Sequence, residues 1–200
     1  ILILVFFLHL IVSSSVFGDN HNKTNINQIY TNLKSKNFSE AIVQLNSLSE
    51  KNNSKAQHLY SQILYAGEIT TQDFEKSYFW AIIAKLGGIK KINNLIDKLD
   101  NLIIEELKFK IHDEIKLFLE KHALKGNKLA VIQIAKWNLD LAIEPDYENA
   151  YKWYNVAVAL GIKSAKVSRD DMLNEIDKQR LFEVQKESNA IFKKINNLGG

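Results

Sequence analysis

Two aspartates, Asp73 and Asp146, are the first candidates for chemistry in this chain, because paired carboxylates can perform general acid–base catalysis. Each is followed by an aromatic residue and then by a glutamate. This order is typical of the start of a helix, where an aspartate accepts hydrogen bonds from free backbone N–H groups and a glutamate complements the helix dipole. We therefore predict that both aspartates are helix caps.

The histidines and the remaining acidic residues offer little more. His112 is followed by Asp113 and Glu114, but a helical zinc site needs a second histidine four residues on, and that position holds Lys116. The chain contains no cysteine, which excludes thiolate metal ligands and cysteine nucleophiles. The sequence therefore predicts no catalytic residue, no metal site and no cofactor. An enzyme would require distant residues to meet in one cleft, and the candidates are Glu105, Glu106, His112 and Asp177.

The elements that must position these residues belong to an internal repeat. When the chain is aligned with itself at an offset of 73 residues, fourteen of the 49 pairs from position 73 to position 121 are identical. A repeat of this kind predicts a stacked helical array. The structural repeat positions are Asp73, Trp80, Ala84 and Gly88 in one copy and Asp146, Trp153, Ala157 and Gly161 in the other. We predict that the two tryptophans are core anchors and that the glycines end helices.

Apolar residues recur at helical spacing from Ile26 onward. They predict an all-α fold, a right-handed α-solenoid of about five antiparallel helix pairs over residues 26–196. The predicted pairs are 26–35 with 38–50, 54–66 with 74–87, 90–100 with 103–125, 127–140 with 147–160, and 164–175 with 178–195. The repeat unit is thus about 36 residues, half of the 73-residue offset, which makes Asn37 an earlier cap and leaves an eroded copy near Asp113. Two such units place Asp73 about 20 Å from Asp146, too far for the roughly 5 to 9.5 Å of a glycosidase pair.

Two stretches carry a family resemblance. They are Ala56, Tyr60, Ser61, Leu64, Gly67, Asp73, Phe74, Ser77, Trp80, Ala84 and Gly88, and then Ala130, Ile134, Ala135, Asn138, Asp146, Tyr147, Ala150, Trp153, Ala157, Gly161 and Ala165. Both resemble the Sel-one-like repeat, a relative of the tetratricopeptide repeat with a longer loop inside each helix pair. The resemblance implies a Sel-one-like superhelix, and proteins of that family act mostly as scaffolds or adaptors in assemblies, including exported bacterial ones. Ser61 and Ala135 stand where the family usually has glycine, and Asn138 and Leu141 where it usually has tyrosine and glycine, which leaves the copy number open.

The first 18 residues differ from the rest of the chain. Ile1 to Val12 are apolar except for His9, and three serines and Val16-Phe17-Gly18 follow. This is the pattern of a secretory signal peptide, and about 12 apolar residues are too few to span a bilayer as a helix. We predict a signal peptide at 1–18, cleaved near Gly18, and a flexible linker at 19–25. The mature protein is then exported, periplasmic if bacterial, with no membrane span after cleavage; an uncleaved N-terminal anchor is the alternative.

The charge of the chain indicates no nucleic-acid partner. The formal net charge is only +3, acidic residues are spread among the lysines, and Arg169 and Arg180 are the two arginines. Nucleic-acid surfaces usually cluster arginine and lysine on one face.

These observations predict a non-enzymatic repeat scaffold in the cell envelope that binds a protein or an extended peptide. The groove is expected on the first helices of successive pairs, since stacked pairs create a concave surface. The candidate partner-binding residues are Gln57, Tyr60, Gln133, Lys136 and Trp137, because exposed tryptophan and tyrosine supply much of the energy of interfaces. The alternatives are an enzyme or enzyme subunit acting on cell-wall material, and a structural spacer without a specific groove.

Overall fold

The chain folds as a succession of helices. The computed structural model describes residues 20–197, with side chains from Ile26 onward, so the predicted signal peptide at 1–18 lies outside the described residues. Between Asn20 and Asn197 there are ten α-helices, two short 3-10 turns and no β-strand. The predicted all-α fold is therefore confirmed.

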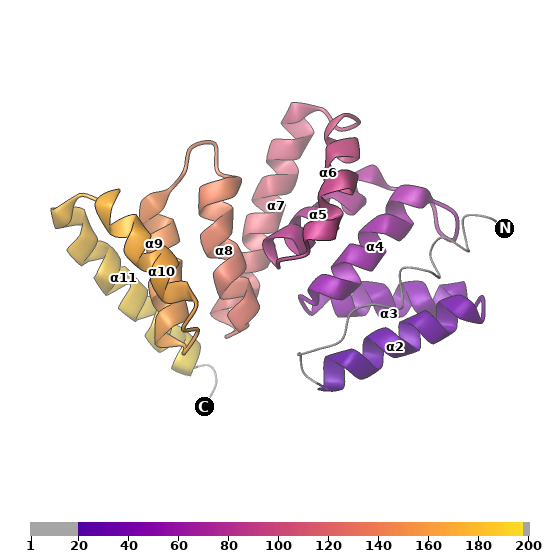
Figure 1. Cartoon of the computed structure of the whole chain (residues 1–200), viewed down its shortest axis with the longest axis horizontal. Helices are drawn as coiled ribbons and strands as arrows, with labels where there is room; N and C mark the ends of the chain where they lie inside the picture. The colour runs from indigo at the N-terminus through magenta and orange to yellow at the C-terminus, as the bar shows by residue number, and fades with distance from the viewer. Residues whose placement is uncertain (1–19, 198–200) are drawn as a thin grey trace.

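The helices follow one another as five consecutive pairs in a curved array from the indigo end to the yellow end of Figure 1. The pairs are α2 (Asn20–Lys34) with α3 (Phe38–Glu50), α4 (Ser54–Ala66) with α5 (Phe74–Leu86), α6 (Asn93–Asp100) with α7 (Glu105–Leu124), α8 (Lys128–Asp140) with α9 (Tyr147–Ala159), and α10 (Ala165–Asp171) with α11 (Lys178–Asn197). In the first, second and fourth pairs the two helices pack on each other, whereas α6 and α7 both pack on α5, and α10 and α11 both pack on α9. The 3-10 turns η1 (Lys90–Ile92) and η2 (Met172–Asn174) adjoin α6 and α10. Helix α2 begins six residues before Ile26, so most of the segment predicted as a linker is helical. The apolar pattern could not reveal this polar extension.

The 73-residue repeat is visible in the helices themselves. Helices α5 and α9 are both 13 residues long, and α7 and α11 are both 20 residues long. Helix α9 starts 73 positions after the start of α5, and α11 starts 73 positions after the start of α7. The carboxylate of Asp73 accepts from the N–H of Lys76 at 2.9 Å, and that of Asp146 accepts from the N–H of Asn149 at 3.0 Å. Both aspartates are thus helix caps, as predicted. Trp80 and Trp153 are buried, which confirms them as core anchors.

The caps of the other helices differ from expectation. Asn37, predicted to cap α3, makes no side-chain cap bond. The backbone differs at this position: Asn37 has φ −81° and ψ 65°, whereas Asn53 and Asn127, which do cap their helices, have extended backbones with ψ of 107° and 104°. The caps that the sequence reading missed are Asn53 and Asn127, whose side chains accept from the Ala56 and Ala130 N–H groups.

A buried network of amides joins the middle pairs. Asn52, in the α3–α4 turn, donates to the Gln133 side-chain oxygen at 2.7 Å, and Gln133 donates to the Ile83 carbonyl at 2.9 Å. Gln57 donates to the side-chain oxygen of Asn52 at 3.0 Å and to the Ser49 carbonyl at 3.1 Å. Because Gln133 lies on α8 and Ile83 on α5, the network ties three helix pairs together.

A second polar contact recurs with the repeat. The Tyr78 hydroxyl lies 3.2 Å from Nε2 of His112, and the Tyr151 hydroxyl accepts from the Gln185 amide at 3.1 Å. Both partners of the second contact lie 73 positions after those of the first. The duplicated unit therefore includes a bond between the second helices of neighbouring pairs, α5 to α7 and α9 to α11.

Candidate functional site

Most of the residues predicted to line a binding groove are buried. Gln57 and Gln133 have no exposed surface and belong to the amide network. Tyr60 is 4% exposed and packs on Trp80 with 6.4 Å between ring centroids. These three residues cannot present a docking surface, so the prediction is corrected. The cause is that α4 and α8 are packed between α3 and α5 and between α7 and α9, which covers the faces expected to be open.

Lys136 and Trp137 have structural partners as well. Lys136 is half-buried, and its ammonium donates to the Leu86 carbonyl at 3.3 Å, at the end of α5. Trp137 is 6% exposed, and its indole N–H donates to the His112 carbonyl at 3.1 Å. Of the five predicted residues, Trp137 is nevertheless the one that lines an open groove.

That groove, the α7–α8 groove, has a volume of about 320 Å³. It lies between α7, α8 and the loop that follows α8. The lining comprises Phe109, His112, Asp113 and Lys116 of α7, Trp137 and Asn138 of α8, and Leu141, Ala142, Ile143, Glu144 and Asp146 of the loop. Phe109 is 51% exposed and Ile143 is 89% exposed. Two large apolar side chains thus stand at the opening of a groove that has a tryptophan in its wall.

The groove carries an excess of negative charge. Asp113, Glu144 and Asp146 are acidic, and Lys116 is the basic residue of the lining. The Lys116 ammonium lies 4.9 Å from the centroid of the Trp137 ring, so its charge is partly engaged there. Burial lowers the pKa of His112 below its ordinary value, which keeps this imidazole neutral at neutral pH. Three carboxylates against one ammonium leave two net negative charges.

The residues of the enzymatic alternative are only partly brought together. Glu105 and Asp100 lie close enough to Tyr78 and His112 to influence the pKa of both side chains, and Lys108 bridges Glu105 at 2.6 Å and Asp100 at 3.6 Å. Burial first, and then Asp100, raise the pKa of Tyr78, which makes its hydroxyl a weaker acid and keeps it protonated at neutral pH. Because Tyr78–His112 recurs as Tyr151–Gln185, the contact works equally with an amide that does not titrate.

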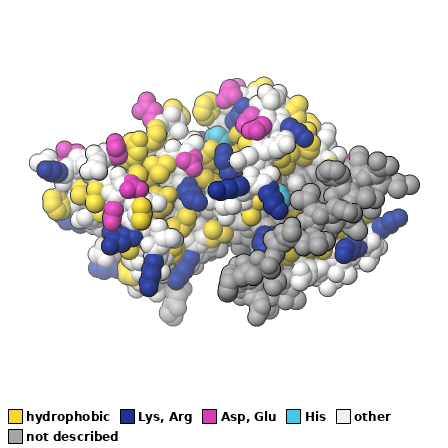
Figure 2. Space-filling model, in the orientation of Figure 1, with side chains coloured by type: hydrophobic (Ala, Val, Ile, Leu, Met, Phe, Trp, Pro, Cys, Tyr) yellow, Lys and Arg dark blue, Asp and Glu magenta, His cyan; other side chains and the backbone are white. Residues whose placement is uncertain are grey.

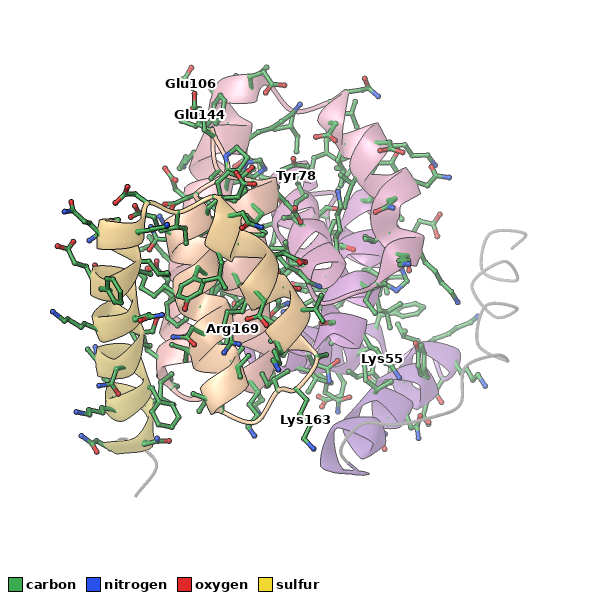
Figure 3. All side chains as sticks on the ribbon, turned by 60° about the vertical axis from the view of Figure 1, so that its left-hand side comes forward. Lys55, Tyr78, Glu106, Glu144, Lys163 and Arg169 are labelled. Carbon is green, nitrogen blue, oxygen red and sulfur yellow. The ribbon has the colours of Figure 1, made fainter. Side chains whose placement is uncertain are left out.

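The other two residues of that alternative lie elsewhere. Asp177 accepts from the N–H groups of Gln179 and Arg180 at the start of α11, so it is a helix cap. Glu106 is exposed in the first turn of α7, at the same end of the array as Glu144 in Figure 3. The gathering in one cleft that the enzymatic alternative requires is therefore not found for these four residues.

A smaller cleft lies between α5 and α7 and has a volume of about 290 Å³. Asp73 caps α5, Lys76 lies 5.3 Å from the Tyr60 ring centroid, and Lys110 pairs with Glu114 at 3.9 Å. Unlike the α7–α8 groove, this cleft is lined by no large apolar side chain that is exposed to solvent.

The described part of the chain, from Asn20 to Asn197, contains neither a candidate metal site nor a helix that could span a membrane. No group of three or more histidines or acidic residues is placed there to hold a metal ion. None of the helices between Asn20 and Asn197 combines the length and hydrophobicity that a bilayer-spanning helix requires.

Comparison with solved structures found similarity to proteins of known structure. No protein-family model matches the chain, and no curated protein matches it significantly. The chain is similar to the crystal structure of a protective antigen present in uropathogenic Escherichia coli strains, which is described as displaying an SLR fold. The identity is 14% and the TM-score is 0.38 over 78% of this chain. The match spans 41% of the length of that protein.

Proposed function

We propose that this protein is a helical-repeat scaffold that binds an extended peptide segment of a partner protein in the α7–α8 groove. The observation that carries the proposal is the pair Phe109 and Ile143, which expose half or more of their surface at the edge of a groove walled by Trp137. Water-exposed apolar side chains that converge on a concavity are typical of interaction sites.

The charges of the groove specify the chemistry of the segment. The carboxylates of Asp113 and Glu144 have no salt-bridge partner within the described residues. A segment with a lysine or arginine on either side of one large apolar side chain would satisfy both features: its apolar side chain would cover Phe109 and Ile143, and its cations would approach the carboxylates. Such rim charges contribute mainly to specificity and association rate.

The rest of the fold keeps the groove in shape. Trp137 is fixed by its bond to the His112 carbonyl, and His112 is in turn bonded to Tyr78. The α8–α9 loop is anchored by the Asp146 N–H, which donates to the Asn138 carbonyl at 2.8 Å. A groove that is already formed loses little entropy on binding, which favours affinity for short segments.

The repeat itself supplies a matched control for the test. Phe182 lies 73 positions after Phe109, on α11, and is 65% exposed, but it does not line the α7–α8 groove. Replacing either phenylalanine by alanine removes the same exposed ring from an equivalent helix position. The two variants therefore differ only in whether the groove loses an anchor.

The experiment starts from a displayed library of random dodecapeptides selected on the full chain. An enriched peptide is synthesised, and its dissociation constant is measured by fluorescence anisotropy for wild type, Phe109→Ala, Ile143→Ala and Phe182→Ala. We expect enriched sequences with an apolar residue beside lysine or arginine. Loss of an exposed aromatic anchor typically costs about 1–2 kcal/mol, which corresponds to roughly 5- to 30-fold weaker binding. Equal affinities for Phe109→Ala and Phe182→Ala would overturn the assignment of the groove.

We further propose that the protein is exported to the cell envelope. The support is the sequence of residues 1–18, with its apolar run and small residues before Asp19. Fractionation followed by N-terminal sequencing tests this. A mature chain starting at Asp19 in the envelope fraction is expected, and a chain that keeps these residues in the cytosolic fraction would contradict the proposal.

A further inference from the structure

The two edges of the helical array have opposite charge. Apart from the α2–α3 turn, which holds Lys34 and Lys36, the turns within helix pairs carry mostly acidic residues, at positions 68, 73, 75, 97, 100, 105, 106, 140, 144, 146, 148, 170, 171, 175 and 177. The turns between pairs carry lysines instead. Figure 3 shows the contrast, with Glu106 and Glu144 at one end of the helices and Lys55 and Lys163 at the other. In Figure 2 the acidic side chains gather toward the upper edge and many basic ones lie at the lower left.

We call the edge formed by the turns between helix pairs the lysine edge. It comprises Lys51 and Lys55 around the α3–α4 turn, Lys85, Lys90 and Lys91 around the α5–α6 turn, Lys121, Lys125 and Lys128 around the α7–α8 turn, Lys163 and Lys166 around the α9–α10 turn, and Lys193 and Lys194 near the end of α11. All of them are exposed. Glu50 is the acidic residue that lies in the same turns.

These turns lie close to one another in space. A Cβ built on Gly87, in the α5–α6 turn, would collide with Ser54 in the first turn of α4. A Cβ built on Gly126, in the α7–α8 turn, would lie 3.5 Å from Ile195 Cγ2 near the end of α11. The α3–α4 turn therefore adjoins the α5–α6 turn, and the α7–α8 turn adjoins the end of α11, so lysines of separate repeats are neighbours.

The fold does not account for this charge. None of the twelve lysines takes part in a salt bridge within the described residues. Lys55, Lys128 and Lys166 stand in the first turns of α4, α8 and α10. A helix N-terminus carries partial positive charge, so lysines there are unfavourable and add to a potential that is already positive. The lysines of this edge repel one another in the free protein, and binding to a negatively charged partner would relieve that repulsion.

We propose that the lysine edge docks the protein on a bilayer that contains anionic phospholipids. Lysines spread over several turns suit a surface of many headgroups, since each lysine contributes separately to attraction by an anionic membrane. Val167, which is 69% exposed, stands next to Lys166 and supplies an apolar side chain at the same edge. Nucleic acid is less suited, because the edge contains no arginine and presents no exposed aromatic side chain for stacking on bases.

The position of the start of α2 is consistent with a bilayer at the lysine edge. Helix α2 runs antiparallel to α3, so its first residue, Asn20, lies at the edge where α3 ends with Glu50. Seven residues separate Asn20 from Val12, the end of the apolar run in the sequence. Seven extended residues reach at most about 25 Å. In the uncleaved form, the alternative to cleavage near Gly18, an apolar run that enters a bilayer would therefore hold this edge within that distance of the headgroups; in the cleaved chain the lysines alone supply the attraction.

The test compares two four-lysine variants of the full chain with wild type. One replaces Lys90, Lys128, Lys163 and Lys166 by glutamine, and the control replaces Lys34, Lys98, Lys178 and Lys186, which lie off the lysine edge. Both lower the net charge by the same amount, and both keep residues 1–18. Binding is measured by co-sedimentation with vesicles of phosphatidylcholine alone and with vesicles that contain about one third phosphatidylglycerol.

Wild type is expected to bind the anionic vesicles more tightly than the neutral ones. Loss of four lysines from the edge should weaken that binding by about 600-fold, at about fivefold for each lysine, while the control variant changes it far less. Raising the salt to about 0.5 M should abolish the difference between vesicle types. Equal losses in the two variants, or no preference of wild type for anionic vesicles, would overturn the proposal. So would lysine-edge-dependent binding to a short DNA duplex without binding to the vesicles.

Discussion

The amide network at the centre of the array makes the stability of three helix pairs depend on Gln133. Replacing it by leucine keeps the volume of the side chain but removes both of its hydrogen bonds. The Ile83 carbonyl still accepts from the Gly87 N–H at 3.0 Å, so it stays paired. The Asn52 amide, which is 3% exposed, is left with a donor that has no partner.

An unpaired buried donor costs about 1–3 kcal/mol, and the leucine recovers part of this by burying apolar surface. We therefore expect Gln133→Leu to lower the free energy of unfolding by about 2 kcal/mol. At a slope of about 2 kcal/mol per molar urea, the midpoint of unfolding should move down by about 1 M. The assay is urea unfolding followed by far-ultraviolet circular dichroism. Gln179→Leu, at an exposed position of α11, serves as the control and should stay within about 0.5 kcal/mol of wild type.

A second substitution, at Asn52, tests whether the unpaired Asn52 donor causes the loss of stability in Gln133→Leu. Asn52 has a φ of 60°, a left-handed conformation that glycine adopts freely, so Asn52→Gly removes the orphaned donor without backbone strain. Gln57 keeps its bond to the Ser49 carbonyl. The double variant should therefore be less destabilised than the sum of the two single variants, by about 1–2 kcal/mol. Additive losses, or a Gln133→Leu variant as stable as wild type, would refute the role assigned to the network.

Three further predictions follow from the polar contacts and turns. His112→Gln should stay within about 0.5 kcal/mol of wild type, because glutamine does the same work at position 185, whereas His112→Leu should cost about 1–2 kcal/mol by leaving the Tyr78 hydroxyl unpaired; equal unfolding midpoints for the two variants would contradict this. Burial in the folded state lowers the pKa of His58, His112 and His122 below the ordinary value of 6.5, so the unfolded chain binds protons first as the pH falls. The free energy of unfolding should therefore decline from about pH 7 to pH 5, with a smaller decline in His112→Gln. A urea midpoint that is constant over this range would show that the shifts are absent. Gly87→Ala should cost about 1–3 kcal/mol because the added methyl lies 2.9 Å from Ser54 Cβ, and Ser54→Gly in the same chain should restore part of the loss in a thermal melt; no recovery would point to a different cause.

The array itself could be predicted because its signals are local and occur twice. Asp73 and Asp146 indicate where helices begin, and Trp80 indicates a core position. Gly88 and Gly161, with φ of 92° and 86°, indicate where helices end. Each of these residues acts within a few positions of itself, and the 73-residue match confirmed the pattern independently. Two other caps, Asn53 and Asn127, follow the same rule and could have been found by it.

The binding surface could not be predicted in the same way, because exposure depends on neighbouring pairs. Gln57 and Gln133 are polar and lie on first helices, which suggested that they face solvent. Their side-chain amides instead donate to the backbone carbonyls of Ser49 and Ile83, which lie on other helices. Phe109 and Ile143 were overlooked because one lies on a second helix and the other in a loop. One available signal was missed: Tyr78 and Tyr151 match in the repeat, and so do the polar positions 112 and 185 that contact them.

The central claim is that the α7–α8 groove holds a peptide segment of a partner, and photo-crosslinking tests it most directly. A benzophenone side chain is introduced at position 109, inside the groove, or at position 182, the equivalent position outside it, and each protein is irradiated with the selected dodecapeptide. We expect a covalent adduct from position 109, which excess unlabelled peptide abolishes, and no adduct above background from position 182. Adducts of equal yield from both positions, or from position 182 alone, would contradict it.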